Sequence, residues 1–240
     1  MNLWNQFLWV IFPYLMFTIF FVGHFYRFNT DQYGWTAKSS EILEKRGLKW
    51  GSLLFHWGII FVFFGHVAGI LVPKWVYSVI GVSEEMYHIG AVWVGGFVGI
   101  VTMIGILLLL GRRLAVGRIY VNSSTSDIVT VVSLVIVMGL GLGTTMGYTA
   151  LGGEFDYRET IGPWFRSLFV FSPQPELMAG APLIFQLHIL AAFALFGIWP
   201  FTRLVHVWSL PLTYLRRSYV VYRSLNPKKA LQAQSVRRQE

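Results

Sequence analysis

Five long runs of apolar residues, separated by more polar segments, make up about half of the 240-residue chain. Each run is close to the roughly 20 residues that an α-helix needs to cross the hydrocarbon core of a bilayer. We therefore predict an all-α integral membrane protein built as a five-transmembrane-helix bundle. The expected spans are residues 3–26, 50–72, 86–110, 128–148 and 183–208.

Prolines and polar residues mark the ends of these runs. Pro73 follows the second run, Pro182 begins the fifth, and Pro200 lies inside the fifth. Asp127 stands where the fourth helix would take its N-cap. The first run starts close to Met1, lacks a basic leader and is too long for a signal sequence, so we expect it to remain as a helix.

Three segments lie outside the expected spans. Residues 39–49 are charged and helix-prone, and we expect them at the inner membrane surface. The aromatic stretch 162–171 is expected to pack at the outer interface. The polar and basic residues 226–240 would be disordered alone and could be ordered by a partner. We divide the chain into a membrane domain, 1–225, and a cytoplasmic tail, 226–240.

The orientation follows from the basic residues, which concentrate in cytoplasmic loops. All but three of the 19 Lys and Arg residues fall in the first loop, the third loop and the C-terminal segment. The exceptions are Lys74, Arg158 and Arg166. We predict an N-terminus outside and a C-terminus in the cytoplasm, with the basic surface available to anionic lipid or a partner.

The composition supports a membrane protein and restricts its chemistry. Hydrophobic residues make up 55% of the chain and charged residues 12%, about half the charged fraction of a soluble domain. The absence of cysteine excludes disulfides, iron–sulfur clusters and thiolate zinc sites from this chain. The net charge of +8 follows the loops, which argues against a nucleic-acid partner.

Four histidines lie inside the expected spans, where ionisable residues are costly and usually functional. His56 and His66 are in the second run, and His188 and His206 in the fifth. The two helices run in opposite directions, so His56 is level with His206 near the inner face. His66 is likewise level with His188, nearer the outer face. The four histidines therefore form two cross-helix pairs.

The spacings within the two helices differ. His188 and His206 are 18 residues apart, five whole turns, which places them on one face of a continuous helix. His56 and His66 are 10 residues apart and point about 80° away from each other. The mean spacing corresponds to levels about 21 Å apart. Helix tilt or a kink at Pro200 must absorb the difference.

Each low-spin haem b requires one pair of histidines, so two pairs at two levels could hold two haems. Small residues next to the histidines would let a macrocycle approach the backbone; they are Gly58, Gly65, Gly69, Ala191, Ala192 and Ala194. The alternative is that the glycines serve helix packing and that each imidazole makes a structural hydrogen bond.

The other two histidines lack such partners. We interpret His24, near the inner end of the first helix, as an interfacial residue. His88 starts the third helix at the outer level. It could accept a proton from a bound substrate or be an ordinary residue at a helix end.

Several motifs resemble the cytochrome b (gamma) subunit of bacterial respiratory nitrate reductase. They are QYGWTAKSS, LFHWGII, GHVAGILVPKW, LLLGRRL, FQLHI and WPFTRLVHVWSLPLTYL. The resemblance extends from the first helix to about residue 222. It implies an inner, proximal haem b on His56 and His206, and an outer, distal haem b on His66 and His188.

The resemblance also implies a quinol site near the distal haem, around Gly65 and His66. Family members often carry a basic residue at the start of the third helix; here His88 is the nearest candidate, since no lysine stands there. The family's inner arginines correspond to Arg112, Arg113 and Arg203. These could pair with haem propionates or anchor the helix ends.

The function that the resemblance implies is an oxidoreductase subunit in the bacterial inner membrane. Quinol would be oxidised outside with release of protons, and electrons would pass through the distal and then the proximal haem. They would leave for an iron–sulfur beta subunit on the cytoplasmic face, and a molybdenum-containing alpha subunit would reduce nitrate. The alternatives are a related haem b subunit of another quinone-linked oxidoreductase, and a haem-free anchor or transporter.

Overall fold

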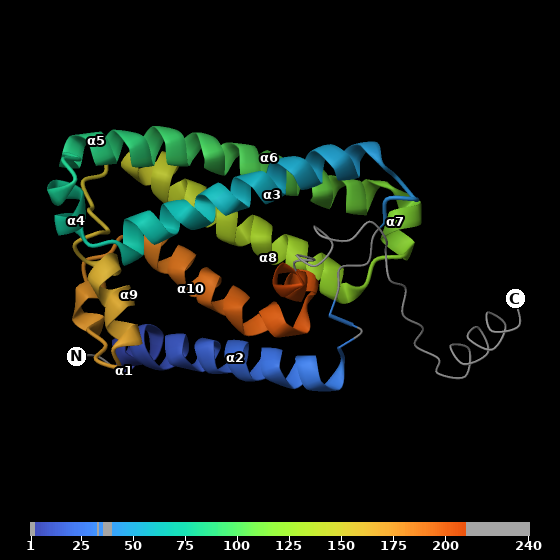
Figure 1. Ribbon diagram of the computed structural model, residues 1–240, viewed down its shortest axis with the longest axis horizontal. Coiled ribbons are helices and arrows are strands. Elements are labelled where there is room, and N and C mark those ends of the chain that lie inside the picture. The colour runs from blue at the N-terminus through green and yellow to red at the C-terminus, as the bar shows by residue number, and fades with distance from the viewer. Residues whose placement is uncertain (1–2, 33, 36–39, 210–240) are drawn as a thin grey trace, which may run out of the picture.

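The computed structural model describes residues 3–32, 34–35 and 40–209, and the regular elements of this part are all helical (Figure 1). Five of its helical rods are long and apolar enough to cross a membrane. They are Leu3–Thr30, Arg46–Leu71, Glu84–Ala115, Thr125–Thr149 and Leu183–Phe201. The predicted helical fold and the number of spans are confirmed; the predicted tail, 226–240, lies outside the described residues.

Several spans combine two kinds of helix. The first contains α1 (Leu3–Gln6), η1 (Phe7–Ile11) and α2 (Phe12–Thr30), and the second contains α3 (Arg46–His66) and η2 (Val67–Leu71). The third contains α5 (Glu84–Ile89), η3 (Gly90–Val94) and α6 (Gly95–Ala115), and the fourth contains α8 (Thr125–Leu142) and η4 (Gly143–Thr149). The fifth contains α10 (Leu183–Ile198) and η6 (Trp199–Phe201), after which comes η7 (Arg203–Trp208). In the first four spans the η segment is π-helical.

The spans lie side by side along the long axis of the molecule (Figure 1). Packing runs from α3 to α6, α8, α10 and α2. The connecting elements α4 (Lys74–Val79) and α9 (Ile161–Phe169) mark one end of the bundle, which we call the α9 end. The connecting element α7 (Gly117–Val121) marks the other, the α7 end.

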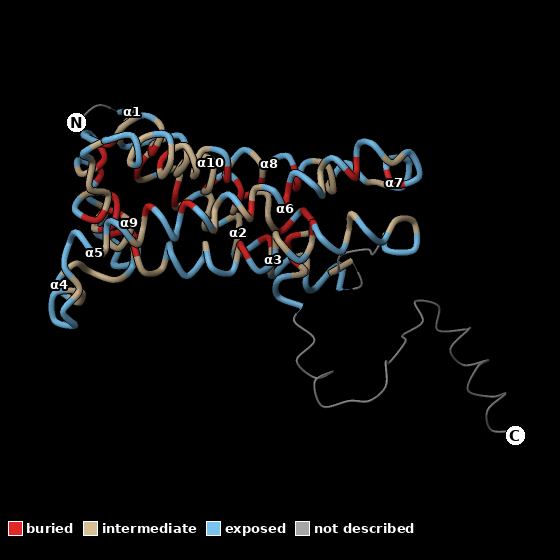
Figure 2. Tube along the Cα trace, turned by 90° about the horizontal axis from the view of Figure 1, so that it is seen from above, coloured by how far each residue is buried: buried red, intermediate tan, exposed pale blue. Residues whose placement is uncertain are grey.

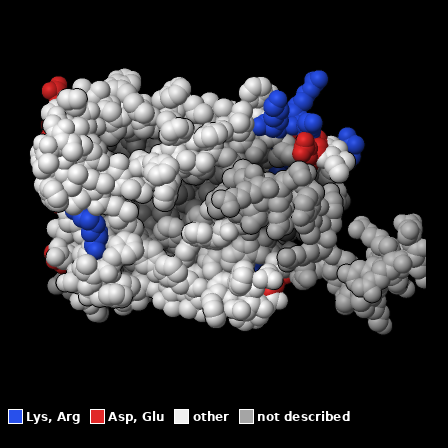
Figure 3. All heavy atoms as spheres, in the orientation of Figure 1, with Lys and Arg blue, Asp and Glu red and all other residues white. Residues whose placement is uncertain are grey.

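The outward faces of the spans are apolar and exposed, and buried residues lie inside (Figure 2). Exposed side chains include Phe21, Phe61, Trp93 and Phe97. Such a surface would aggregate in water, but in lipid it is the ordinary surface of a spanning helix. In the view of Figure 3, Lys and Arg gather mainly at the α7 end, and the middle of the molecule carries little charge.

Helices α3 and α6 pack closely through glycines. A Cβ on Gly58 would lie 2.0 Å from Oγ1 of Thr102, and a Cβ on Gly105 would lie 2.4 Å from the backbone nitrogen of Phe55. Small residues let helices approach in this way within a membrane. Gly58 therefore serves helix packing, the alternative that the sequence left open. Because α3 carries two of the candidate ligands, this contact also fixes their depth.

The fifth span departs from the prediction. We expected one helix over 183–208, but α10 ends at Ile198 and Thr202 is extended, with φ −117° and ψ 177°. The chain then continues as the 3₁₀ segment η7. Pro200 has no N–H to donate and its ring obstructs the helix that precedes it, which explains the break. His188 and His206 thus do not share one regular helix, and the expected common face does not apply.

Two smaller expectations also change, and a third segment, the aromatic stretch, packs against the end of the bundle. The N-cap of α8 is Ser124, and Asp127 is its partner in a capping box. Within 40–49, residues from Arg46 onward belong to α3 instead of a separate surface helix. Helix α9, in the aromatic stretch, is largely buried: Trp164 is 0% exposed and donates from its indole nitrogen to the carbonyl oxygen of Trp9 at 3.0 Å.

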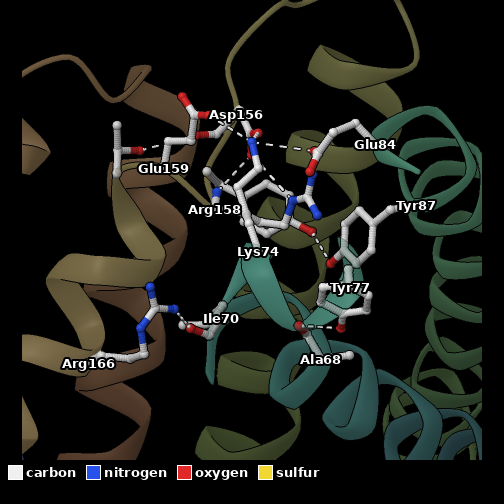
Figure 4. A network of polar contacts seen from close by, with 12 residues as sticks. Ala68, Ile70, Lys74, Tyr77, Glu84, Tyr87, Asp156, Arg158, Glu159 and Arg166 are labelled. Atoms are coloured by element: carbon white, nitrogen blue, oxygen red, sulfur yellow. Dashed lines mark hydrogen bonds and ion pairs between the residues drawn. The ribbon is translucent and has the colours of Figure 1, made fainter. Parts of the chain in front are cut away.

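An ionic network ties the loops together at the α9 end (Figure 4). Nζ of Lys74 lies 2.9 Å from Asp156, 2.7 Å from Glu159 and 3.4 Å from Glu84. Buried Arg158 pairs with Glu84 and with Asp156. The hydrogen bond that Lys74 donates to Glu159, and the bond and charges of Asp156 and Glu159, raise the pKa of Lys74. Two of the three basic residues that the sequence predicts outside, Lys74 and Arg158, therefore join the second and fourth loops.

The network should make stability depend on pH in acid. Burial works to raise the pKa of Asp156, but the Lys74 hydrogen bond and the Arg158 contacts outweigh it and lower the pKa. A lowered folded pKa stabilises the fold above the unfolded value of about 3.9 and ceases to do so as pH falls through the folded value. We expect Asp156→Asn to lower the melting temperature modestly at pH 7, because the carboxylate is partly screened. The effect should shrink progressively as the pH falls below the unfolded value of about 3.9. Glu154→Gln, an exposed carboxylate nearby, is the control; an effect that does not shrink as the pH falls would contradict the prediction.

Candidate metal centres

The structure brings the four spanning histidines together in the two predicted pairs. His56 on α3 faces His206 on η7, with ring centres 6.1 Å apart and ring planes at 70°. His66, at the end of α3, faces His188 on α10, with ring centres 6.0 Å apart and planes at 39°. Helices α3 and α10 run in opposite directions (Figure 1), so the first pair lies nearer the α7 end and the second nearer the α9 end.

Both separations fit an iron ion held between two imidazoles. With metal–nitrogen bonds of about 2 Å on either side, the two ring centres would stand roughly 6 Å apart. Each site supplies two protein ligands, whereas a structural zinc site needs about four. A haem brings its four equatorial ligands with it and requires two axial ones. The donor sets therefore fit haem b.

The hydrogen bonds of the four imidazole rings also suit metal ligation. In each ring, Nδ1 donates to a backbone carbonyl oxygen. The bonds run from His56 to Ser52 (2.8 Å), His66 to Val62 (2.8 Å), His188 to Val137 (3.0 Å) and His206 to Arg203 (2.5 Å). A carbonyl on Nδ1 fixes the tautomer and leaves the Nε2 lone pair to bind a metal, the usual arrangement around ligating histidines.

Glycines next to the pairs do different things. Gly141 on α8 makes room for His188, since a Cβ there would lie 3.0 Å from Cε1 of that ring. Gly65 faces open space, with no atom within 4 Å of the position of a Cβ, so the chain next to His66 leaves room for a ligand. Gly69 instead packs against the hydroxyl groups of Tyr87 and Tyr157. Only some of the small residues therefore border the candidate sites.

The two levels are closer together than the mean spacing suggested. His56 and His66 lie on one regular α-helix, so the 10 residues between them correspond to about 15 Å along the axis. The fifth span matches this distance over 18 residues because its backbone breaks at Thr202. The Pro200 region thus absorbs the mismatch, but by ending the helix.

His24 differs from the four paired histidines. Its Nδ1 donates to the carbonyl oxygen of Phe20 at 2.6 Å, and its Nε2 accepts from Nε1 of Trp208 at 3.2 Å. Both ring nitrogens therefore have protein partners, and the ring packs among Phe20, Trp35 and Trp208. His24 joins the end of α2 to η7.

His88 is exposed on α5 at the α9 end, the end to which the His66–His188 pair is closer. The residue before it, Tyr87, turns inward and exchanges a hydrogen bond of 3.0 Å with Tyr157 (Figure 4). The guanidinium group of Arg158 lies 3.8 Å from the centre of the Tyr87 ring. Sequence reasoning overlooked this group, because nothing local relates residue 87 to residues 157 and 158.

The three arginines that the resemblance singles out, Arg112, Arg113 and Arg203, have different surroundings. All three nitrogens of Arg112 donate to the 40–44 segment: Nε to Glu44 at 2.6 Å, Nη1 to the Ser40 hydroxyl at 2.9 Å, and Nη2 to backbone oxygens of both. Arg113 donates to Ser123. Arg203 lies three residues before His206 and donates from Nη1 to Asp127 at 2.8 Å. Helix anchoring is thus the evident role of Arg112.

A pocket of about 530 Å³ opens beside His56 at the α7 end. Its lining includes Lys45, Lys49, Ser52 and Trp57. Lys45, Lys49, Ser52 and His56 are three or four residues apart, so they lie on the same face of the helix. Cationic side chains are thus available beside the His56–His206 pair, in addition to Arg203.

Comparison with known proteins identifies the family. The family model described as nitrate reductase gamma subunit matches residues 5–225. The chain belongs to the nitrate reductase gamma subunit family. The nitrate reductase gamma chain of Bacillus subtilis is 52% identical over 219 residues, covering 91% of this chain and 98% of the relative.

Two further relatives are similar to most of this chain. The respiratory nitrate reductase 2 gamma chain of Escherichia coli is 38% identical over 222 residues, 92% of this chain and 97% of its own length. The nitrate reductase-like protein NarX of Mycobacterium tuberculosis is 42% identical over 224 residues, 93% of this chain but 34% of its own length. The predicted family is confirmed, and the chain is a subunit of an oxidoreductase complex.

Proposed function

We propose that this chain is the quinol-oxidising, dihaem cytochrome b subunit of a respiratory nitrate reductase in the bacterial inner membrane. The observation that carries the proposal is the pair of bis-histidine sites. In both pairs the ring centres are about 6 Å apart, which is the separation that an iron ion between two imidazoles requires. In all four rings Nδ1 donates to a backbone carbonyl oxygen. Family membership supports the assignment to nitrate reductase.

Haem b, when bound, supplies one-electron redox chemistry, and the chain supplies ligation, spacing and a low-dielectric setting. His56 and His206 would hold the proximal haem, and His66 and His188 the distal one. Arg203 is the best placed of the three predicted propionate partners, because it lies three residues before His206. Its hydrogen bond to Asp127 is made by Nη1.

Quinol would bind at the α9 end, around Gly65 and His66. The open space beside Gly65 and the exposed aromatic residues Phe63 and Phe64 suit an apolar quinone ring and tail within lipid. His88, exposed at this end, would accept a proton from the quinol and release it to the outer solution. Electrons would then move toward the α7 end.

The partners would dock at the α7 end. An iron–sulfur beta subunit there would receive electrons from the proximal level, and a molybdenum-containing alpha subunit beyond it would reduce nitrate to nitrite. The basic residues at this end (Figure 3) suit a cytoplasmic location, an acidic partner surface and anionic membrane lipid.

The proposed orientation places the α9 end outside. Because the chain contains no cysteine, a single introduced cysteine is the only site on this chain that a maleimide can label. In intact cells we expect a membrane-impermeant maleimide to label Glu154→Cys, in the fourth loop, and to label Asn122→Cys, beside α7, only after permeabilisation. The reverse pattern would contradict the proposed topology.

Haem content is the most direct test of the proposal. We expect the purified wild-type complex to contain about two b haems per gamma-family chain by pyridine haemochrome assay, and His56→Ala to contain about one. A well-folded chain without haem would support the alternative of a haem-free anchor or transporter. Two haems with partners other than a nitrate reductase would support another quinone-linked complex.

A further inference from the structure

The proximal ligand His206 lies on an irregular segment, unlike the other three. His56, His66 and His188 are on the α-helices α3 and α10, whose internal hydrogen bonds fix the backbone. His206 follows the break at Thr202 and lies on the 3₁₀ segment η7. A break inside or at the edge of a membrane leaves backbone carbonyl groups that need other donors. The donors present here determine where His206 can lie.

Arg27, near the end of α2, supplies the first of these donors. Its Nη1 donates to the carbonyl oxygens of Pro200 at 2.7 Å and of Thr202 at 2.8 Å, while Nη2 donates to that of Gly34 at 2.7 Å. One guanidinium group thus spans both sides of the break. Gly23, one turn earlier on α2, lets Pro200 approach, since a Cβ there would lie 2.9 Å from the proline ring.

Asp127, in the first turn of α8, holds the break from the other side. Its Oδ1 accepts from Nη1 of Arg203 at 2.8 Å, and its Oδ2 lies 3.4 Å from Nη1 of Arg113. The capping box with Ser124 fixes the carboxylate on the helix end. The backbone oxygen of Arg203 in turn accepts the Nδ1 proton of His206 at 2.5 Å. Asp127 is therefore linked to His206 through one residue, Arg203.

We propose that Arg27 and Asp127 are positioning residues for His206, locking the 199–208 segment so that this imidazole faces His56. The inference rests on the proposed function, in which His206 binds the proximal haem. Neither residue touches the imidazole ring. Removing either one would free one side of the break, so His206 would lose its orientation toward His56, while the other three histidines would stay on their helices.

The experiment compares Arg27→Gln and Asp127→Asn with wild type in the purified complex containing the full chain. Low-temperature electron paramagnetic resonance and a redox titration follow the two haems separately, with His206→Ala as the reference for a lost proximal signal. We expect both variants to shift the proximal low-spin signal and its midpoint potential. Retention of the proximal haem should fall about tenfold, as for other residues that orient metal ligands, while the distal haem is unchanged.

Conservative variants and a matched control sharpen the test. Arg27→Lys keeps a cation that can reach one carbonyl and should restore part of the wild-type spectrum. Arg166→Gln is the control, because Arg166 also donates to a backbone carbonyl, that of Ile70 at 2.5 Å, but at the α9 end. It should leave the proximal signal unchanged.

The possible outcomes separate the inference from its premise. A wild-type complex without haem would refute the proposed function. Two haems in wild type and a proximal signal that is insensitive to both variants would refute the positioning role alone. Equal loss of both haems in the variants would also refute it, since that result indicates a general loss of folding.

Discussion

Replacement of His66 by alanine should reduce the haem content from about two per chain to about one and abolish quinol oxidation. Alanine cannot ligate iron, and the opposing ring of His188 would be left without its partner 6.0 Å away. Because the distal level is the proposed entry point, quinol-driven nitrate reduction should fall by at least about 100-fold, more than is usual for a residue that only supports a ligand.

The measurement combines a pyridine haemochrome assay with nitrate reduction driven by two kinds of donor. A soluble one-electron donor that reaches the partner subunits directly should still support nitrate reduction in the His66→Ala complex. His88→Ala provides the control for haem content: it should retain two haems, and its quinol kinetics report whether His88 takes part at that site. Two haems in His66→Ala would show that this residue is not a ligand.

Gly105→Ala should destabilise the protein and lower the content of both haems together. The added methyl group would lie 2.4 Å from the backbone nitrogen of Phe55 and 2.9 Å from its Cα. Backbone atoms cannot rotate away, so α3 must move relative to α6, at a cost of about 1–3 kcal/mol. Since α3 carries both His56 and His66, its displacement disturbs both candidate sites at once.

Thermal unfolding in detergent, with haem absorbance as a second readout, would measure this effect. Gly111→Ala is the matched control on the same helix, because no atom lies within 4 Å of the position of its Cβ. It should be neutral or slightly stabilising, by up to about 1 kcal/mol from helix propensity. Equal behaviour of the two variants would mean that the α3–α6 contact does not limit stability.

The arginines show how far sequence reasoning extends toward the sites. The LLLGRRL motif placed Arg112 and Arg113 together at an inner helix end, and both are buried there. Yet Arg112 binds the 40–44 segment, whereas Arg113 and Arg203 share Asp127. Their partners lie up to 76 positions away, so no local pattern could predict them.

The sequence by itself determined the five spans, the two antiparallel histidine pairs and the family. Span length and apolar composition are local properties of the sequence. A long apolar helix is stable in lipid whichever helices pack against it. Only the tertiary structure decided where the fifth helix ends and what holds the segment beyond it. A proline permits a kink or a break, and the choice depends on whether distant groups satisfy the freed carbonyls. Here Arg27 does so, and it lies in a helix more than 170 residues earlier in the chain.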